Sequence, residues 1–107
     1  MLHAPPNLRY VEGVDTVLAA LAGLAAVAIA RGQPVRAAHI LGAVEAECER
    51  QGWSGRPPHP VEGREFEEDA AAVRAMVDEV SWQATWTTGR AMSIEEAVSY
   101  ALVEARE

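Results

Sequence analysis

The chain has 107 residues, a length that fits one domain. Half of the residues are hydrophobic, with many alanines and few aromatic residues, and this composition excludes a disordered chain. The formal charge of −7 and the lack of lysine exclude the clustered basic surface that binds the phosphates of a nucleic acid. The same acidity disfavours binding to an anionic membrane surface.

Cysteine usage is minimal. A single cysteine, Cys48, excludes an internal disulfide and a zinc site built from several cysteines. Its position on one helical stripe with Leu41 and Val44 predicts a buried thiol rather than a reactive one. A lone thiol also fits a reducing compartment, so we expect the protein to be cytoplasmic.

The first strong pattern is an amphipathic helix. It is predicted from about Tyr10 to Arg31, after a flexible lead-in over residues 1–9. Its apolar face holds Val14, Val17, Leu18, Leu21, Leu24, Ala25 and Ala28. Arg31 suits the negative end of the helix dipole, and Gly32 suits the left-handed position that closes a helix.

The apolar run from Val17 to Ala30 invites comparison with membrane and secretion signals. It is shorter and richer in alanine than a transmembrane helix, which needs about 20 strongly apolar residues. It ends in Ala-Ile-Ala, which resembles a signal-peptide cleavage site, but Glu12 and Asp15 precede it where a signal peptide is basic. We therefore expect a core helix and no contact with a membrane.

A second helix is predicted from Pro34 to about Gln51. Proline is favoured in the first turn of a helix, and Gly52 repeats the stop signal of Gly32. The apolar face of this helix holds Ala37, Ile40, Leu41, Val44 and Cys48. Because only two or three residues join the two helices, residues 10–52 must form an antiparallel hairpin.

The remaining residues, 61–107, are predicted to add three helices after a proline-rich loop over residues 53–60. The third helix is expected from about Val61 to Val77. The fourth is expected from about Asp78 to Thr88, and Gly89 would close it beside a surface arginine, Arg90. Residues 10–107 would then form a single helical-repeat domain.

The sequence signals for the starts of the helices after residue 60 differ in strength. Gly63 weakens the first turn of the third helix. The last helix begins with the capping box Ser93-Ile94-Glu95-Glu96, in which serine and the second glutamate each bond the other's backbone N–H. Since no stretch alternates apolar and polar residues as a strand does, the predicted fold is all-α, with about five helices in antiparallel hairpins.

Residues 18–51 resemble a degenerate tetratricopeptide repeat, a 34-residue helical hairpin. The residues that match its pattern are Leu21, Leu24, Ala25, Gly32, Ala37, Leu41 and Val44. In that repeat small residues let the two helices approach, and larger residues fill the groove to the next hairpin. The resemblance implies a fragment of an α-solenoid, although Val44 is larger than the usual alanine.

A second resemblance extends from about Tyr10 to Leu102. Its matching residues are Gly32, Arg36-Ala37-Ala38, Leu41-Gly42-Ala43, Glu45-Ala46, Pro57-Pro58, Phe66-Glu67, Arg74, Trp86, Gly89-Arg90-Ala91-Met92-Ser93, Glu95-Glu96-Ala97 and Tyr100-Ala101-Leu102. This pattern resembles the helical segment near the carboxyl end of bacterial LuxR-type transcription factors and of related multidomain signal-transduction ATPases.

The second resemblance implies a scaffold or sensor arm of a transcriptional regulator. The chain has neither the phosphate-binding G-x-x-x-x-G-K-[ST] loop nor a basic recognition helix, so only this adaptor role is implied. The sequence leaves open whether the chain stands alone or belongs to a longer regulator.

Titratable residues do not form a pattern typical of a catalytic or metal site. His3, His39 and His59 lack ligand spacing, although His39 and Glu47 could share a helix face. The carboxylates occur in runs that are expected to form solvated helix faces. No serine has a histidine or aspartate at a spacing typical of nucleophilic catalysis. We therefore predict no catalytic residues, no metal and no cofactor.

Three tryptophans and a methionine are the candidate interaction or ligand residues. Trp82 and Trp86 are one helical turn apart and are expected to lie mainly in the core, with an exposed anchor as the alternative. Trp53 lies in the loop, where a surface anchor and a packed side chain are equally plausible. Met92 would join Trp82 and Trp86 in lining a pocket between hairpins.

The predicted function is a non-catalytic helical-repeat module that binds a protein partner or neighbouring repeats. Because a repeat buries a continuous core only when several units stack, we also expect self-association. The alternative hypothesis is a small-effector sensor that biases an attached ATPase through the pocket beside Trp82 and Trp86. An enzymatic role is the least favoured hypothesis.

Overall fold

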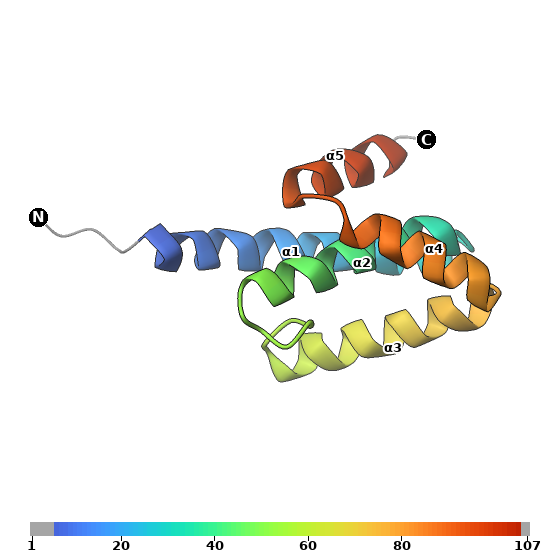
Figure 1. The fold of residues 1–107 in the computed structure, drawn as a ribbon, viewed down its shortest axis with the longest axis horizontal. Helices are drawn as coiled ribbons and strands as arrows, with labels where there is room; N and C mark the ends of the chain where they lie inside the picture. The colour runs from blue at the N-terminus through green and yellow to red at the C-terminus, as the bar shows by residue number, and fades with distance from the viewer. Residues whose placement is uncertain (1–5, 106–107) are drawn as a thin grey trace, which may run out of the picture.

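The structure is a computed structural model that describes residues 6–105, with side-chain surroundings described for residues 13–103. Within these residues the chain folds into five helices and contains no strand (Figure 1). The helices are α1 (Pro6–Ala30), α2 (Pro34–Arg50), α3 (Pro60–Met76), α4 (Glu79–Arg90) and α5 (Ile94–Ala105). The prediction of an all-α fold with about five helices is confirmed.

Helix α1 begins four residues earlier than the sequence pattern predicts. It starts at Pro6 rather than Tyr10, so the predicted lead-in includes the first helical turn. Proline suits a first helical position because the missing N–H would have no partner there. The rest of that lead-in, residues 1–5, lies outside the described residues.

The turn between α1 and α2 follows the predicted glycine signal. Gly32 has a φ of +70°, and its N–H donates to the carbonyl of Ile29 at 3.0 Å. The N–H of Gln33 donates to the carbonyl of Ala28 at 2.8 Å, which completes a Schellman motif. This closure folds α2 back along α1, and the predicted antiparallel hairpin is present (Figure 1).

Helix α2 is the centre of the molecule. It packs against α1, α3, α4 and α5, and ten of its 17 residues are buried. The core around it holds Val14, Leu18, Leu21, Ala25, Ala28, Ala37, Ala38, Ile40, Leu41, Ala43, Val44, Cys48, Phe66, Val73, Trp82, Ala97 and Ala101. Cys48 is completely buried as predicted, and its pKa is raised to about 12 by burial first and then by nearby Glu47. The thiol is therefore protonated and unreactive at neutral pH.

Two glycines let α4 cross closely over α2. A Cβ on Gly42 would lie 2.6 Å from the carbonyl oxygen of Trp86, and a Cβ on Gly89 would collide with the carbonyl oxygen of His39. The sequence predicted that Gly89 closes α4 after Thr88. This prediction is wrong, because α4 continues to Arg90. The role of Gly89 is close packing between two helices.

The loop before α3 packs over the first turn of that helix. A Cβ on Gly63 would lie 2.9 Å from the carbonyl oxygen of Pro57, so the glycine leaves room for the loop. At the other end of α3, Arg74 pairs with Glu79 at 2.6 Å and joins α3 to α4. Asp78 caps α4 by accepting from the backbone N–H of Ser81 at 2.8 Å. This cap separates α3 from α4.

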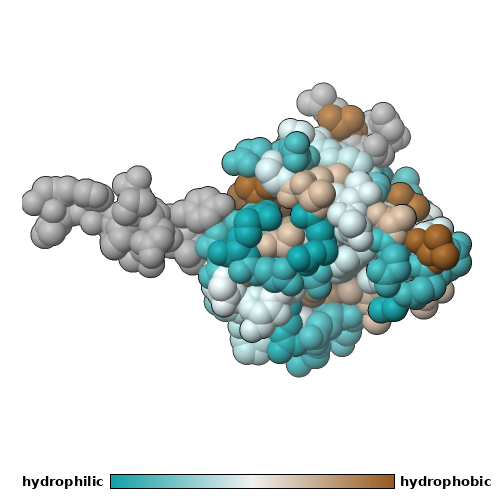
Figure 2. Space-filling view, in the orientation of Figure 1, coloured by the Kyte–Doolittle hydropathy of each residue, from teal (hydrophilic) through white to brown (hydrophobic). Residues whose placement is uncertain are grey.

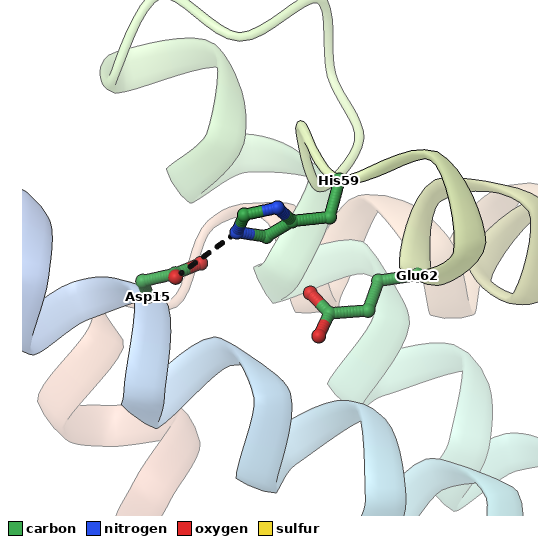
Figure 3. Close-up of side chains that lie close together, drawn as sticks. All are labelled: Asp15, His59 and Glu62. Atoms are coloured by element: carbon green, nitrogen blue, oxygen red, sulfur yellow. Dashed lines mark ion pairs between the residues drawn. The ribbon is translucent and has the colours of Figure 1, made fainter.

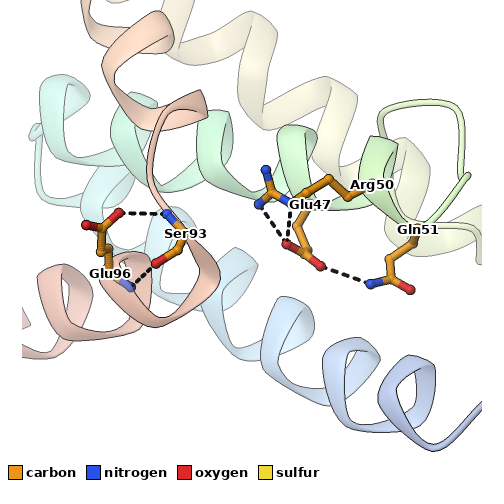
Figure 4. A network of polar contacts seen from close by, with 5 residues as sticks. All are labelled: Glu47, Arg50, Gln51, Ser93 and Glu96. Atoms are coloured by element: carbon orange, nitrogen blue, oxygen red, sulfur yellow. Dashed lines mark hydrogen bonds and ion pairs between the residues drawn. The ribbon is translucent and has the colours of Figure 1, made fainter. Parts of the chain in front are cut away.

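The predicted capping box of α5 is confirmed. The N–H of Glu96 donates to Ser93 Oγ at 3.0 Å, and the N–H of Ser93 donates to Glu96 Oε1 at 2.8 Å (Figure 4). Helix α5 is also joined to α2 by His39, whose Nδ1 lies 2.9 Å from the hydroxyl oxygen of Tyr100. These contacts fix the start and the orientation of the last helix.

Much of α1 lacks a cover within the molecule. Among the described residues, α1 alone contains a stretch, Gly13–Ala30, that is long and apolar enough to cross a bilayer by length and composition, and 28% of that stretch is buried. The prediction that this run is too short to cross a membrane is wrong by length and composition, because the apolar helical stretch has 18 residues. Core helices of globular proteins and signal sequences can be equally long and apolar, so these properties alone do not identify a membrane helix. Here Leu18, Leu21 and Ala25 belong to the core.

Candidate interaction surfaces

The structure brings two of the predicted tryptophans together. The ring centroids of Trp82 and Trp86 are 4.5 Å apart, and Phe66 on α3 lies 6.3 Å from Trp86. Trp82 is 7% exposed, which confirms that its main role is core packing. The guanidinium of Arg74 lies 5.4 Å from the Trp82 ring, in the range of a cation–π contact. The cluster links the side chains of α3 and α4, while both helices pack on α2.

Trp86 also takes part in a polar network with α2. Its indole N–H donates to Glu45 Oε1 at 2.7 Å, and Arg90 binds the same oxygen at 2.6 Å. A second nitrogen of Arg90 donates to Glu49 at 2.5 Å, which lowers the pKa of the Glu49 carboxyl and raises that of Arg90. Arg90 remains partly exposed at the surface, and its side chain binds the two carboxylates along α2, which the sequence did not predict.

The two tryptophans border an open cavity of about 380 Å³. It is lined by Glu45, Ser54, Gly55, Arg56, Phe66, Glu67, Ala70, Arg74, Trp82 and Trp86. Met92 does not line this cavity, and borders a separate hollow with Glu47, Arg50 and the first turn of α5. Trp53 is half-buried and packs against the core. The expected grouping of Met92 with the tryptophans is wrong, because Met92 lies in the turn after α4, which ends at Arg90, and borders the first turn of α5 instead.

One carboxylate expected on a solvated face is buried. Glu47 is 2% exposed, and its Oε1 accepts from Arg50 at 2.7 Å while its Oε2 accepts from Gln51 at 2.9 Å (Figure 4). Arg50 is about half exposed, so the buried carboxylate of Glu47 is paired with a cation that contacts solvent. Sequence spacing gave no sign of this burial, because α2 is covered on several sides.

Three possible metal ligands meet at the start of α3. The ligand atoms of Asp15, His59 and Glu62 all lie within 4.8 Å of one another, although no spacing in the sequence suggests it (Figure 3). His59 Nε2 lies 3.5 Å from Asp15 Oδ2. One histidine and two carboxylates could ligate a divalent ion with open positions left for water. His59 and Glu62 are exposed, and they lie close together because Glu62 is in the first turn of α3 and His59 directly precedes that helix.

A groove of about 470 Å³ runs between α1 and α3. Its floor is apolar and is formed by Leu18, Ala19, Ala22, Gly23, Ala26, Pro57 and Phe66. Its rim is acidic and is formed by Asp15, Glu62, Glu65, Glu68 and Asp69. None of the lining residues is basic. The pKa of Asp69 is raised by burial first and then by Glu65 and Glu68.

A different apolar surface lies on the side of α1 that faces α5. Its exposed or half-exposed side chains are Val17, Leu24, Val27 and Val98, with Leu102 one helical turn after Val98 on the same side of α5. The space-filling view shows separate apolar groups near the two ends of α5, with more hydrophilic side chains between them, and further apolar groups at the right, over α4 (Figure 2). Glu95 borders this surface at one end, and Arg31 with Arg36 borders it at the other.

Comparisons of the chain with models of protein families, with curated proteins and with solved structures give no match. The class of protein that the structure defines is a five-helix all-α domain built around a central helix. The resemblances to the tetratricopeptide repeat and to LuxR-type regulators stay predictions.

Proposed function

We propose that the chain is a non-catalytic helical interaction module of a bacterial transcriptional regulator, which acts by packing apolar helix faces against other helices. The observation that carries this proposal is the uncovered state of α1. Only 28% of its Gly13–Ala30 stretch is buried, although the stretch is almost entirely apolar. Exposed apolar surface of this extent is typical of a site where another protein packs.

The surface between α1 and α5 is the proposed contact. Val27 is 47% exposed, and Leu102 is 55% exposed. Burying apolar area contributes about 25 cal/mol of free energy for each Å². A partner that covers these side chains would therefore be bound more stably. The resemblance to regulators supports a scaffold role for this contact, in which neighbouring helical hairpins would supply the cover.

A second copy of the chain fits the same surface when no other partner is present. A two-fold interface places the same surface of each copy face to face. In an antiparallel arrangement, Glu95 at one end of the surface would meet Arg31 and Arg36 at the other end of the second copy. Opposite charges would then face each other despite the net charge of −7. We therefore propose self-association of the isolated protein.

Sedimentation velocity over a wide concentration range tests this proposal. We expect the parent protein to associate as its concentration rises and the Val27→Glu variant to stay monomeric. Val80→Glu is the matched control, because Val80 is 79% exposed but lies on α4, away from this surface. A parent protein that stays monomeric throughout and melts at a high temperature would contradict the proposal.

The cavity beside the tryptophans supports a second candidate function, the binding of a small effector. Trp82 and Trp86 offer aromatic faces there, and Arg74 and Glu45 offer opposite charges. Such a mixture of aromatic and polar groups is common in ligand sites. A screen of metabolites by tryptophan fluorescence, in a Trp53→Phe background, tests this role. Ligands that leave the emission unchanged would leave only the packing role.

A further inference from the structure

We propose that the groove between α1 and α3 binds a basic amphipathic helix of a partner protein, with apolar side chains on the floor and Lys or Arg side chains on the rim. This inference deepens the proposed interaction function and rests on it, but it concerns a different surface. The partner is inferred from the chemistry of the groove alone.

The floor of the groove suits the close approach of a helix. Ala19, Ala22, Gly23 and Ala26 recur at helical spacing along the same side of α1. Their small side chains allow a second backbone to approach, in the way that small residues permit close helix packing elsewhere. Phe66 from α3 adds a large apolar side wall. A row of apolar side chains from the partner would fill this space.

The rim determines the charge of the partner. Glu62, Glu65 and Asp69 recur at intervals of three or four residues on one side of α3, and Glu68 lies among them. Asp15 faces them from α1 and is paired with His59. Burial raises the pKa of Asp69 first, and the like charges of Glu65 and Glu68 raise it further, so cations placed along this rim would relieve the repulsion among these carboxylates.

The same charges disfavour other occupants. A second copy of this chain carries a net charge of −7 and would bring further carboxylates to an acidic groove. An anionic membrane or a nucleic acid would be repelled for the same reason. The apolar floor distinguishes the proposed ligand from a simple polycation, because charged side chains alone would leave the floor uncovered.

Fluorescence anisotropy with synthetic peptides tests the proposal on the full chain. The probe is a labelled helical peptide of leucine and lysine with one apolar stripe. Two control peptides replace either the lysines by glutamate or the leucines by serine. Buffer with EDTA keeps divalent ions away from Asp15, His59 and Glu62. We expect binding of the leucine–lysine peptide only, weakened at high salt because exposed charge pairs are screened.

Matched variants locate the peptide. Glu65→Lys is expected to weaken binding by about three- to ten-fold, whereas Glu79→Lys on α4, outside both proposed contact surfaces, changes the net charge equally and leaves binding unchanged. Ala22→Phe fills the floor and is expected to weaken binding in the same way. Ala84→Phe, an exposed change on α4 that lines neither the groove nor the surface between α1 and α5, is its control. Circular dichroism confirms that each variant is folded.

Several results would overturn the proposal. Equal weakening by Glu65→Lys and Glu79→Lys would show that net charge alone attracts the peptide. Equal binding of the lysine–serine peptide would show that the apolar floor has no role, and equal binding of the glutamate peptide would show that the rim has none. Self-association lost in Val27→Glu with no peptide binding in the parent would retain the proposed function and reject only this inference.

Discussion

Gly42 on α2 and Gly89 on α4 face each other where the two helices cross. A Cβ on Gly42 would lie 3.4 Å from the Cα of Gly89 and 2.6 Å from the carbonyl oxygen of Trp86. The crossing therefore depends on the absence of two side chains. It places Trp86 and Arg90 beside Glu45 and so creates the polar network between α2 and α4.

The first prediction concerns this crossing. Gly89→Ala should lower the free energy of unfolding by about 1–3 kcal/mol, because overpacking forces the two backbones apart. In an exposed helix the same change would stabilise by about 0.5–1 kcal/mol. Gly23→Ala is the control, since a Cβ there meets nothing within 4 Å. Urea denaturation followed by circular dichroism measures both, and equal stability of Gly89→Ala and the parent would contradict the packing role.

The second prediction concerns Glu45. Glu45→Ala should cost about 1–3 kcal/mol, because the partly buried indole N–H of Trp86 and the guanidinium of Arg90 both lose their acceptor. Glu45→Gln should retain part of that stability, since an amide oxygen still accepts from the indole. A double-mutant cycle with Arg90→Gln measures the coupling, and additive effects would show that the ion pair contributes nothing.

The third prediction concerns the start of α5. Ser93→Ala should destabilise by about 1 kcal/mol, because the N–H of Glu96 loses its acceptor. The effect should be concentrated in α5, so amide hydrogen exchange should rise there more than in α2. Ser99→Ala, an exposed change on the same helix, should alter stability by less than about 0.5 kcal/mol. A uniform rise in exchange over all helices would argue against a local cap.

The fourth prediction concerns pH. The pKa of Asp69 is raised in the folded state, so its charge opposes folding above the ordinary value of 3.8 and this penalty is lost as the pH falls through the raised pKa. Asp69→Asn should therefore stabilise the protein at pH 7, and the gain should disappear below about pH 3.8. Urea midpoints across this range test it, and a gain that persists in acid would assign the effect to packing.

Glu49 provides the opposite case. Its hydrogen bond with Arg90 lowers its pKa from 4.5, so the bond stabilises the fold above that value and is lost as the pH falls through the lowered pKa. Glu49→Gln should reduce stability at pH 7 and have no effect in strong acid. Because Glu49 is exposed, the change is expected to be small. A larger loss in acid than at pH 7 would contradict this linkage.

Local signals in the sequence determined the helices and several of their ends. Gly32 closes α1 and Ser93 caps α5 as predicted, because each acts through hydrogen bonds within a few residues. The burial of Cys48 and Trp82 also follows from helical spacing, since an apolar stripe must face the core. These features need no knowledge of the distant part of the chain.

Contacts between distant segments were decided only by the tertiary structure. A glycine at position 89 is typical of a helix end in the sequence. In the structure it is needed for packing, because the backbone of His39, fifty residues away, leaves no room for a side chain there. The sequence pattern of α2 predicts a solvated side chain at Glu47, yet the helices around α2 bury it. The acidic groove and the meeting of Asp15 with His59 arise in the same way, because the angle between α1 and α3 depends on how both helices pack on α2.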